Sequence, residues 1–113
     1  YYDQLSEMAV KGVIRIPQIP PHVEHNGHIF HIRTKNADER MRLMHFLRDN
    51  GIQCATHYIP LHSSKAGRKY GQFIGRDNFT TAESEKLIRL PLYYGITTNE
   101  IDFICQKIRT FYS

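Results

Sequence analysis

The sequence predicts a small α+β domain in which a largely antiparallel sheet carries helices on one face. Segments with apolar residues at helical spacing occur beside short segments in which polar and apolar residues alternate, and this mixture indicates the α+β class. The chain has 113 residues, of which 41% are hydrophobic and 23% charged. That size and composition suit one globular domain.

Charge and cysteine content narrow the classes of function. No apolar run reaches the roughly 20 residues that a membrane helix needs, so a membrane span is not expected. The net charge is only +4, which is modest for a protein that binds nucleic acid. Cys54 and Cys105 lie in apolar stretches, so we expect free thiols and a reducing, cytoplasmic setting. A basic segment covers residues 65–76, and Tyr70 and Phe73 are the only aromatic residues in it. Because a nucleic-acid site would need more interleaved aromatic residues, this segment is better interpreted as a solvated loop. A phosphate-bearing small molecule or an acidic partner is compatible with it. The basic residues of this segment are Lys65, Arg68, Lys69 and Arg76.

The first predicted element is a helix over residues 1–11. Tyr1 and Leu5 recur at helical spacing, and Gly12 is a stop signal. Because no cap precedes the first residue, we expect this helix to continue upstream in the natural protein. Residues 13–16 form a short strand candidate that runs into a proline-rich extended loop.

A core strand is predicted over residues 28–34, where side chains of alternating position face opposite sides of the sheet. This alternation places His28 and Ile32 on one face and His31 on the other. A helix follows to about Asn50, because Asn36 is a favoured N-cap residue. Its other signals are Glu39 three residues after the cap, a buried stripe of Leu43, Met44 and Leu47, and Gly51 as the stop.

In the second half of the chain, the residue pattern predicts one strand, one extended piece and several helices. Residues 52–56 form the third strand, and residues 63–70 a short helix or turn. Thr80 and Glu83 have the spacing of a capping box for a helix over about 81–88, after which an extended piece covers residues 89–92. A second capping box, Thr97 with Glu100, opens the last helix, whose buried residues are Ile101, Ile104, Cys105, Ile108 and Tyr112.

The most informative stretch is His57-Tyr58-Ile59-Pro60-Leu61-His62, at the end of the predicted third strand. Pro60 fixes its own φ and keeps the residue before it out of helical geometry. A stiff turn therefore presents two imidazoles and a phenol, groups that donate and accept hydrogen bonds. Strand ends and the loops beyond them are where α/β scaffolds place ligand-binding groups, so we expect a ligand site here.

A metal site and self-contained catalysis are both disfavoured. His28 and His31 would point to opposite faces of one strand, and only Glu24 is near enough to complete a ligand set. His57 and His62 could serve as acid–base groups, but no nucleophile paired with a base is visible. No glycine-rich phosphate-binding motif occurs either. The histidines that suggest a metal recur at every third position: His22, His25, His28 and His31.

Taken together, these motifs resemble the C-terminal small domain of the PLP-dependent sugar-nucleotide aminotransferases, enzymes of the aspartate-aminotransferase fold type. The resemblance covers nearly the whole chain. It implies that residues 1–12 are the end of an interdomain helix and that residues 13–113 are the small domain. The matching motifs are Gly51-Ile52, the stretch from His57 to His62, Leu90-Pro91-Leu92-Tyr93 and Thr97-x-x-Glu100-Ile101.

The resemblance implies a cytoplasmic, dimeric enzyme that uses PLP to move an amino group from glutamate to the 4-keto carbon of a dTDP-4-keto-6-deoxyhexose. In that family the PLP lysine and the acidic partner of the pyridine nitrogen belong to a large domain that precedes this region. No lysine of this chain lies in a matching motif. We therefore expect that the isolated chain binds no PLP, contributes no catalytic residue and is inactive. Its expected partners are the large domain and a second subunit, and neither nucleic acid nor a membrane.

By motif position, His57 and Tyr58 approach the substrate or the cofactor. His28 is a further substrate-binding candidate, and His62 either contacts the ligand or satisfies backbone carbonyls around Pro60. A second interpretation is a stand-alone ligand-binding or regulatory module that uses the same turn without catalysis. On the first interpretation, apolar surface that normally meets the large domain should lead the isolated chain to self-associate through its first helix.

Overall fold

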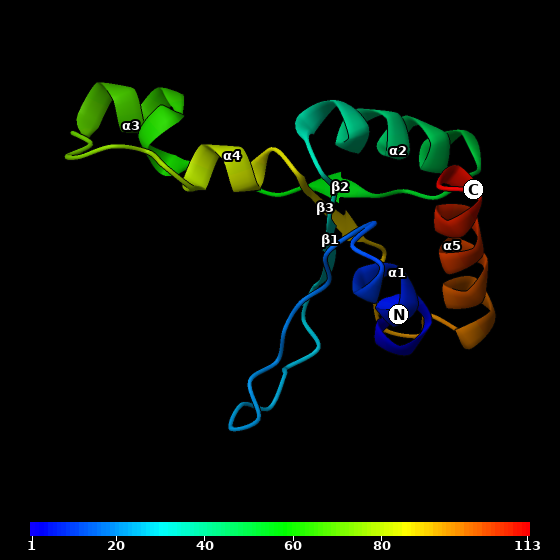
Figure 1. The fold of residues 1–113 in the computed structure, drawn as a ribbon. Helices are drawn as coiled ribbons and strands as arrows, with labels where there is room; N and C mark the ends of the chain where they lie inside the picture. The colour runs from blue at the N-terminus through cyan, green and yellow to red at the C-terminus, as the bar shows by residue number, and fades with distance from the viewer.

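The computed structural model describes residues 1–113 and consists of a three-stranded sheet, five α-helices and one 3-10 helix (Figure 1). Both sheet pairings are antiparallel, in the order β1-β3-β2, so β3 is the central strand. Ile88 of β3 lies opposite Ile32 of β1 on one side and Thr56 of β2 on the other. The elements are α1 (Tyr2–Val10), β1 (Phe30–Arg33), α2 (Ala37–Asp49), β2 (Ala55–Thr56), η1 (Leu61–Ser63), α3 (Lys65–Tyr70), α4 (Thr80–Ser84), β3 (Leu87–Leu90) and α5 (Thr98–Phe111).

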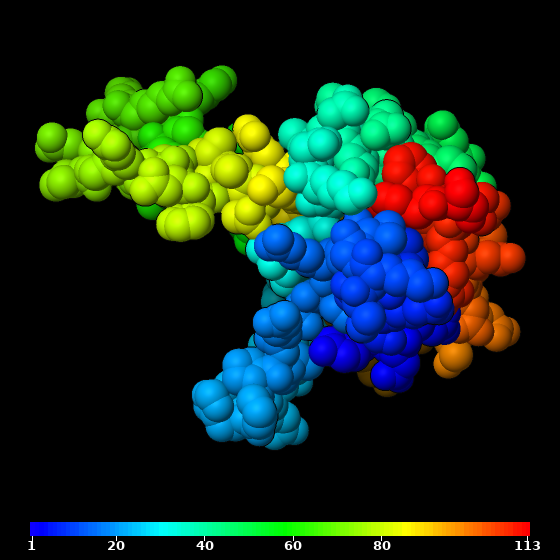
Figure 2. All heavy atoms as spheres, in the orientation of Figure 1, coloured from blue at the N-terminus to red at the C-terminus, as the bar shows by residue number.

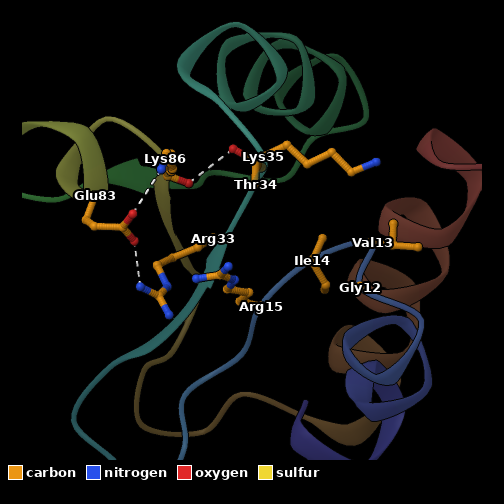
Figure 3. A pocket seen from close by; sticks show the side chains of 9 residues that line it. All are labelled: Gly12, Val13, Ile14, Arg15, Arg33, Thr34, Lys35, Glu83 and Lys86. Atoms are coloured by element: carbon orange, nitrogen blue, oxygen red, sulfur yellow. Dashed lines mark hydrogen bonds and ion pairs between the residues drawn. The ribbon is translucent and has the colours of Figure 1, made fainter. Parts of the chain in front are cut away.

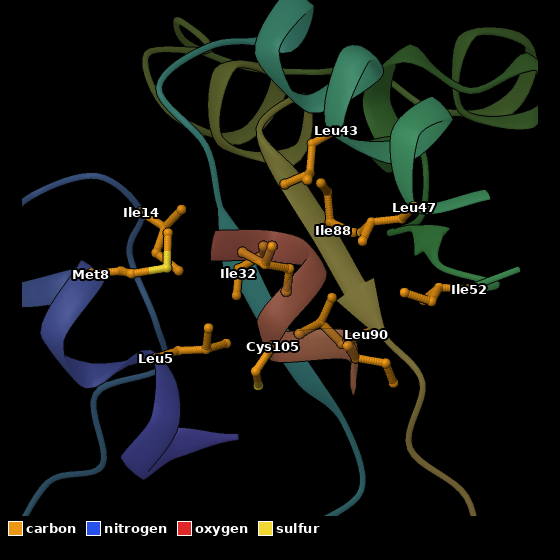
Figure 4. Packing of buried hydrophobic residues seen from close by; sticks show 12 residues of the cluster. Leu5, Met8, Ile14, Ile32, Leu43, Leu47, Ile52, Ile88, Leu90 and Cys105 are labelled. Atoms are coloured by element: carbon orange, nitrogen blue, oxygen red, sulfur yellow. The ribbon is translucent and has the colours of Figure 1, made fainter. Parts of the chain in front are cut away.

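Helices α1, α2 and α5 lie on the same face of the sheet and enclose the hydrophobic core, which confirms the predicted fold class. Figure 4 shows Leu43 and Leu47 of α2 directed at Ile88 of the central strand. All three side chains are 0% exposed. The α1 residues Leu5 and Met8 belong to this same core. None of the helices combines the length and the apolar character that a membrane span requires.

The two longest helices begin where local sequence signals predict. The side chain of Asn36 accepts a hydrogen bond of 2.8 Å from the backbone N–H of Glu39, at the start of α2. At the start of α5, the Thr97 hydroxyl accepts from the N–H of Glu100, whose carboxylate accepts in return from the N–H of Thr97. Each cap satisfies backbone donors that the first helical turn leaves without a partner.

Four of the predicted elements differ in the structure. The strand predicted over 13–16 is reduced to one bridge between Arg15 and Arg33, because Pro17 has no N–H with which to extend the ladder. The strand predicted over 28–34 begins only at Phe30, so His28 precedes it. The strand predicted over 52–56 consists of two residues, Ala55–Thr56.

The fourth difference concerns the helix predicted over 81–88. Thr80 does not cap it: the side chain of Asp77 accepts hydrogen bonds from the N–H and the hydroxyl of Thr81 instead. Helix α4 ends at Ser84, and Leu87–Leu90 form the central strand. Ile88 and Leu90 are buried and alternate with half-buried residues, as in a strand with one face on the core. Leu87–Leu90 also pairs with a strand on each side, and this pairing outweighs the weak helical preference of the residues themselves.

Two segments extend away from the core on the side of the sheet opposite α5 (Figure 1). The first is the loop of residues 17–29, in which residues 18–28 are all exposed. The second is the arm, residues 57–86, which carries η1, α3 and α4 and in which residues 71–80 are all exposed. In the space-filling view a recess separates the loop from the arm (Figure 2).

Candidate functional site

The face of the sheet that the helices leave uncovered is polar. Ile32 and Ile88 point into the core, so their neighbours His31 and Arg89 point the other way and lie opposite each other across β1 and β3. His31 is half-buried, because the base of the loop and the start of the arm converge beside it. This uncovered face, between the loop and the arm, therefore carries His31 and Arg89.

A cavity of about 270 Å³, the histidine hollow, lies at this convergence. His28 comes from the loop, His57 from the start of the arm and His31 from β1, so three segments separated in sequence build it. The hollow brings together two residues predicted as site residues, His28 and His57, and adds two others, His25 and His31. Its full lining is His25, Asn26, His28, Ile29, His31, His57 and Leu87.

Sequence reasoning missed His25 and His31 because it treated His28 and His31 as neighbours within one strand that point to opposite faces. Since β1 begins at Phe30, His28 is outside the strand and its side chain does not follow the strand alternation. Both imidazoles therefore line one hollow. The signal that could have found them is the recurrence of histidine at every third position.

Tyr58 and His62, the other two predicted site residues, do not line the hollow. Tyr58 is 78% exposed and packs edge-to-face on the His57 ring, with ring centroids 5.1 Å apart. His62 lies within the arm, where its Nε2 is 2.9 Å from the Asp77 carboxylate and its ring lies 4.5 Å from that of Phe73. The partner of His62 is thus a carboxylate and not a carbonyl near Pro60. Through these contacts His62, near the start of the arm, is held against Phe73 and Asp77 in the segment that returns toward the sheet.

The environment of His31 lowers the pKa of its imidazole. Partial burial is the main cause, followed by the positive charges of Arg33, His57 and His25. A lowered pKa keeps His31 neutral at pH 7, so that one ring nitrogen donates a hydrogen bond and the other accepts one. The hollow therefore presents hydrogen-bonding imidazole to a ligand.

We expect an NMR titration of the His31 ring to give a pKa below 6.5, the ordinary value. The unfolded chain binds the proton more tightly than the folded chain does, so His31 should stabilise the fold above that pH, with the contribution lost as the pH falls through the folded pKa. In the H57Q variant the titration should move toward 6.5, because one neighbouring charge is removed. A matched H45Q variant, altered on the exposed side of α2, should leave it unchanged. An unchanged His31 titration in H57Q would contradict this assignment.

The hollow does not resemble a metal site or a PLP site. No group of three or more histidine, cysteine, aspartate or glutamate side chains has an arrangement that could hold a metal ion. PLP requires a lysine for the covalent link and an acidic group for the pyridine nitrogen, and the lining of the hollow contains neither. Elsewhere, Lys11 and Lys86 are paired with Glu7 and Glu83 at 2.6 and 2.9 Å. The lining of the hollow therefore does not fit PLP.

Comparison with known proteins gives a family. Residues 1–109 match the DegT/DnrJ/EryC1/StrS aminotransferase family. Over 112 residues the chain is 27% identical to a pleiotropic regulatory protein of Geobacillus stearothermophilus, covering 98% of this chain and 29% of that protein. Over 110 residues it is 27% identical to the 3-oxo-glucose-6-phosphate:glutamate aminotransferase of Bacillus subtilis strain 168, covering 96% of this chain and 24% of that enzyme.

A solved structure has the same fold. The crystal structure of NtdA from Bacillus subtilis with bound cofactor PMP superimposes with a TM-score of 0.72 at 24% identity, covering 98% of this chain and 26% of that one. The chain thus spans less than a third of the length of each of these proteins. Because the family match extends over nearly all of the 113 residues, the chain belongs to the DegT/DnrJ/EryC1/StrS aminotransferase family.

Proposed function

We propose that this chain is the small domain of a PLP-dependent sugar aminotransferase and that its histidine hollow forms one wall of the sugar site. The observation that carries the proposal is the convergence of His28, His31 and His57 in one cavity of a chain that belongs to a sugar aminotransferase family. Imidazoles that line a cavity suit a ligand rich in hydroxyl groups, because each ring offers a donor and an acceptor. Tyr58, beside His57, adds a phenol at the rim.

The substrates that we propose are glutamate as amino donor and a dTDP-4-keto-6-deoxyhexose as acceptor. This proposal rests on the resemblance of the sequence motifs to the dTDP-4-amino-4,6-dideoxygalactose transaminase of enterobacterial common antigen synthesis, and it includes a role in cell-surface polysaccharide synthesis. PLP, when bound, supplies the electron sink that transamination requires. The hollow offers no lysine for the cofactor, so we propose that the lysine comes from the large domain and that the 113-residue chain alone is inactive and non-catalytic.

The remainder of the proposed enzyme would cover the exposed apolar side chains of the loop and the arm. These side chains are exposed in this chain, and a set of exposed apolar residues on two adjoining segments is typical of an interaction surface. We propose that they meet the large domain, with residues 1–12 as the end of an interdomain helix, or the second subunit of a cytoplasmic homodimer. The residues concerned are Ile19, Val23, Tyr58, Ile59, Leu61, Tyr70, Phe73, Ile74 and Phe79. The self-association predicted for the isolated chain would then involve the arm as well as the first helix.

The test of the proposed function is the intact mass and the visible absorbance of the protein as its native source produces it. A product several times heavier than 13.3 kDa that absorbs in the visible range as PLP enzymes do supports the proposal. The recombinant 113-residue chain, incubated with PLP and glutamate, should show no covalent cofactor and no transamination. A native product of 13.3 kDa without a chromophore would contradict it.

A ligand-binding or regulatory module is the second candidate function. The name of the Geobacillus relative, a pleiotropic regulatory protein, is the observation that favours it. This alternative uses the same hollow but requires no lysine and no large domain. The mass and absorbance measurement separates the two candidates, since only the aminotransferase carries a chromophore.

In the native enzyme, we expect H57Q to lower kcat/KM for the keto-sugar by about 10- to 100-fold, the cost of losing a hydrogen bond in a partly desolvated site. The cofactor absorbance should stay unchanged, because His57 does not hold PLP in this proposal. The matched control is H45Q, the same substitution on the exposed face of α2, with wild-type kinetics expected. Equal kinetics for both variants would exclude His57 from the sugar site.

A further inference from the structure

A second cavity on the uncovered side of the sheet carries an excess of positive charge. This cationic cleft has a volume of about 220 Å³ and lies where the turn after α1, the end of β1 and the junction of α4 with β3 meet (Figure 3). It shares no residue with the histidine hollow. Its charged side chains are those of Arg15, Arg33, Lys35, Glu83 and Lys86.

Two arginines lie directly opposite each other in the cleft. Arg15 and Arg33 exchange backbone hydrogen bonds of 2.9 and 2.8 Å in an antiparallel bridge, so their side chains leave the backbone on the same face. Figure 3 shows both guanidinium groups on the same side of β1. Like charges in opposite positions destabilise a strand pair. An anion between the guanidinium groups would remove that repulsion.

Glu83 is the one carboxylate of the cleft, and it pairs with two of the four cations. The Arg33 Nη1 is 2.6 Å and the Lys86 Nζ is 2.9 Å from the carboxylate of Glu83. The guanidinium of Arg15 has no hydrogen-bond or ion-pair partner, and Figure 3 shows Lys35 directed away from the Glu83 pair. Arg15, Arg33 and Lys86 against the one carboxylate leave an excess of two positive charges, which matches a dianion.

The free donors of the cleft have the geometry that phosphate oxygens require. A guanidinium has five N–H donors in a planar fork. Arg33 uses one of its nitrogens for Glu83, and Arg15 uses none. Arginine forks bind phosphate through paired hydrogen bonds. The side chains of Arg33, Glu83 and Lys86 are only 29–35% exposed, which strengthens their interaction with an anion relative to a fully solvated pair.

We propose that the cationic cleft binds a phosphate-type oxyanion, with Arg15 and Arg33 as its principal contacts and Lys86 as a supporting charge. This site is separate from the histidine hollow, and its existence does not depend on the proposed transamination. The oxyanion belongs either to free phosphate or to the diphosphate of a nucleotide. Both offer non-bridging phosphoryl oxygens to the guanidinium forks.

The test is a two-dimensional ¹H–¹⁵N NMR titration of the 113-residue chain, at constant ionic strength, with inorganic phosphate, pyrophosphate and dTDP in separate experiments. Saturable shifts at the amides of Arg15, Arg33 and Glu83 are expected. In R15Q, which alters an exposed residue without a side-chain partner, the affinity should fall about 10-fold or more. R15K keeps the positive charge but loses the planar guanidinium, so its affinity should lie between those of R15Q and the wild type. R76Q removes another exposed arginine, from the arm, and should bind as the wild type does.

The three anions identify the source of the oxyanion. Tighter binding of dTDP than of pyrophosphate assigns the cleft to a nucleotide, and equal binding assigns it to free phosphate or diphosphate. The proposal is overturned if no anion gives saturable shifts at these amides, or if R15Q and R76Q bind equally. Neither result bears on the proposed aminotransferase function, because the mass and absorbance of the native enzyme are measured independently.

Discussion

Replacing Ile88 with alanine is expected to lower the free energy of unfolding by about 2–5 kcal/mol, the range for large-to-small substitutions in a packed core. Ile88 is 0% exposed and lies at the centre of the central strand, paired with Ile32 and Thr56. The two leucines of α2 that contact it cannot collapse into the space, because the strands on both sides hold the backbone in register (Figure 4). Since small domains have only about 5–15 kcal/mol of stability, this one change removes much of it.

Urea unfolding of I88A measures this loss of stability, and I74A, the same substitution at an exposed position, is the control. Ile74 is 87% exposed in the arm, so the same substitution there should change stability by less than about 0.5 kcal/mol. Similar losses in both variants would mean that Leu87–Leu90 is not the central strand of the core.

Replacing Tyr112 with phenylalanine is expected to cost about 1–3 kcal/mol at neutral pH, because the substitution leaves a buried carboxylate without its donor. The Tyr112 hydroxyl donates a 2.6 Å hydrogen bond to Glu39, which is 8% exposed in the first turn of α2. The contact joins the C-terminal end of α5 to the N-terminal end of α2, across 73 positions of sequence.

Tyr112 also gives the variant a distinctive pH dependence. Burial, the hydrogen bond to Glu39 and the charge of that carboxylate raise the pKa of the phenol in the folded state. The unfolded chain therefore loses this proton above about pH 10 while the folded chain retains it, and stability falls as the pH rises. Y112F should lose less stability than the wild type between neutral pH and about pH 11.

Urea midpoints at both pH values test this, with Y94F as the control because Tyr94 is fully exposed. Y94F should match the wild type within about 0.5 kcal/mol at neutral pH. If Y112F were as stable as Y94F there, the contact between Tyr112 and Glu39 would contribute nothing to the fold.

Residue patterns predicted the helices better than the strands. The N-caps at Asn36 and Thr97 form within four residues of sequence, and both occur as predicted. The central strand was predicted only in part, because Leu87 and Ile88 also fit the end of a helix. Two partner strands, one of them more than 50 positions earlier in the sequence, decide that they are extended.

The candidate site shows the same division. The motif around His57 identified one side of the histidine hollow, and the histidine at position 28 was a weaker candidate that the hollow includes. In the sequence, Tyr58 was a candidate of the same rank as His57, and His62 was either a ligand contact or a support for the turn at Pro60. The direction of the arm separates them, since it carries His62 away to Asp77.

The sequence by itself determined the caps of α2 and α5, the greater part of their buried stripes, the α+β class and the resemblance to sugar aminotransferases. Each of these depends on residues close together in the chain or on a motif of fixed spacing. Only the tertiary structure decided which histidines share a cavity and which arginines oppose each other across a bridge. The reason is physical. The loop leads into β1 and the arm leaves β2, the two strands that flank β3, so residues distant in sequence come within contact. The strand register, set by burial of one sheet face, determines which side chains meet on the other face.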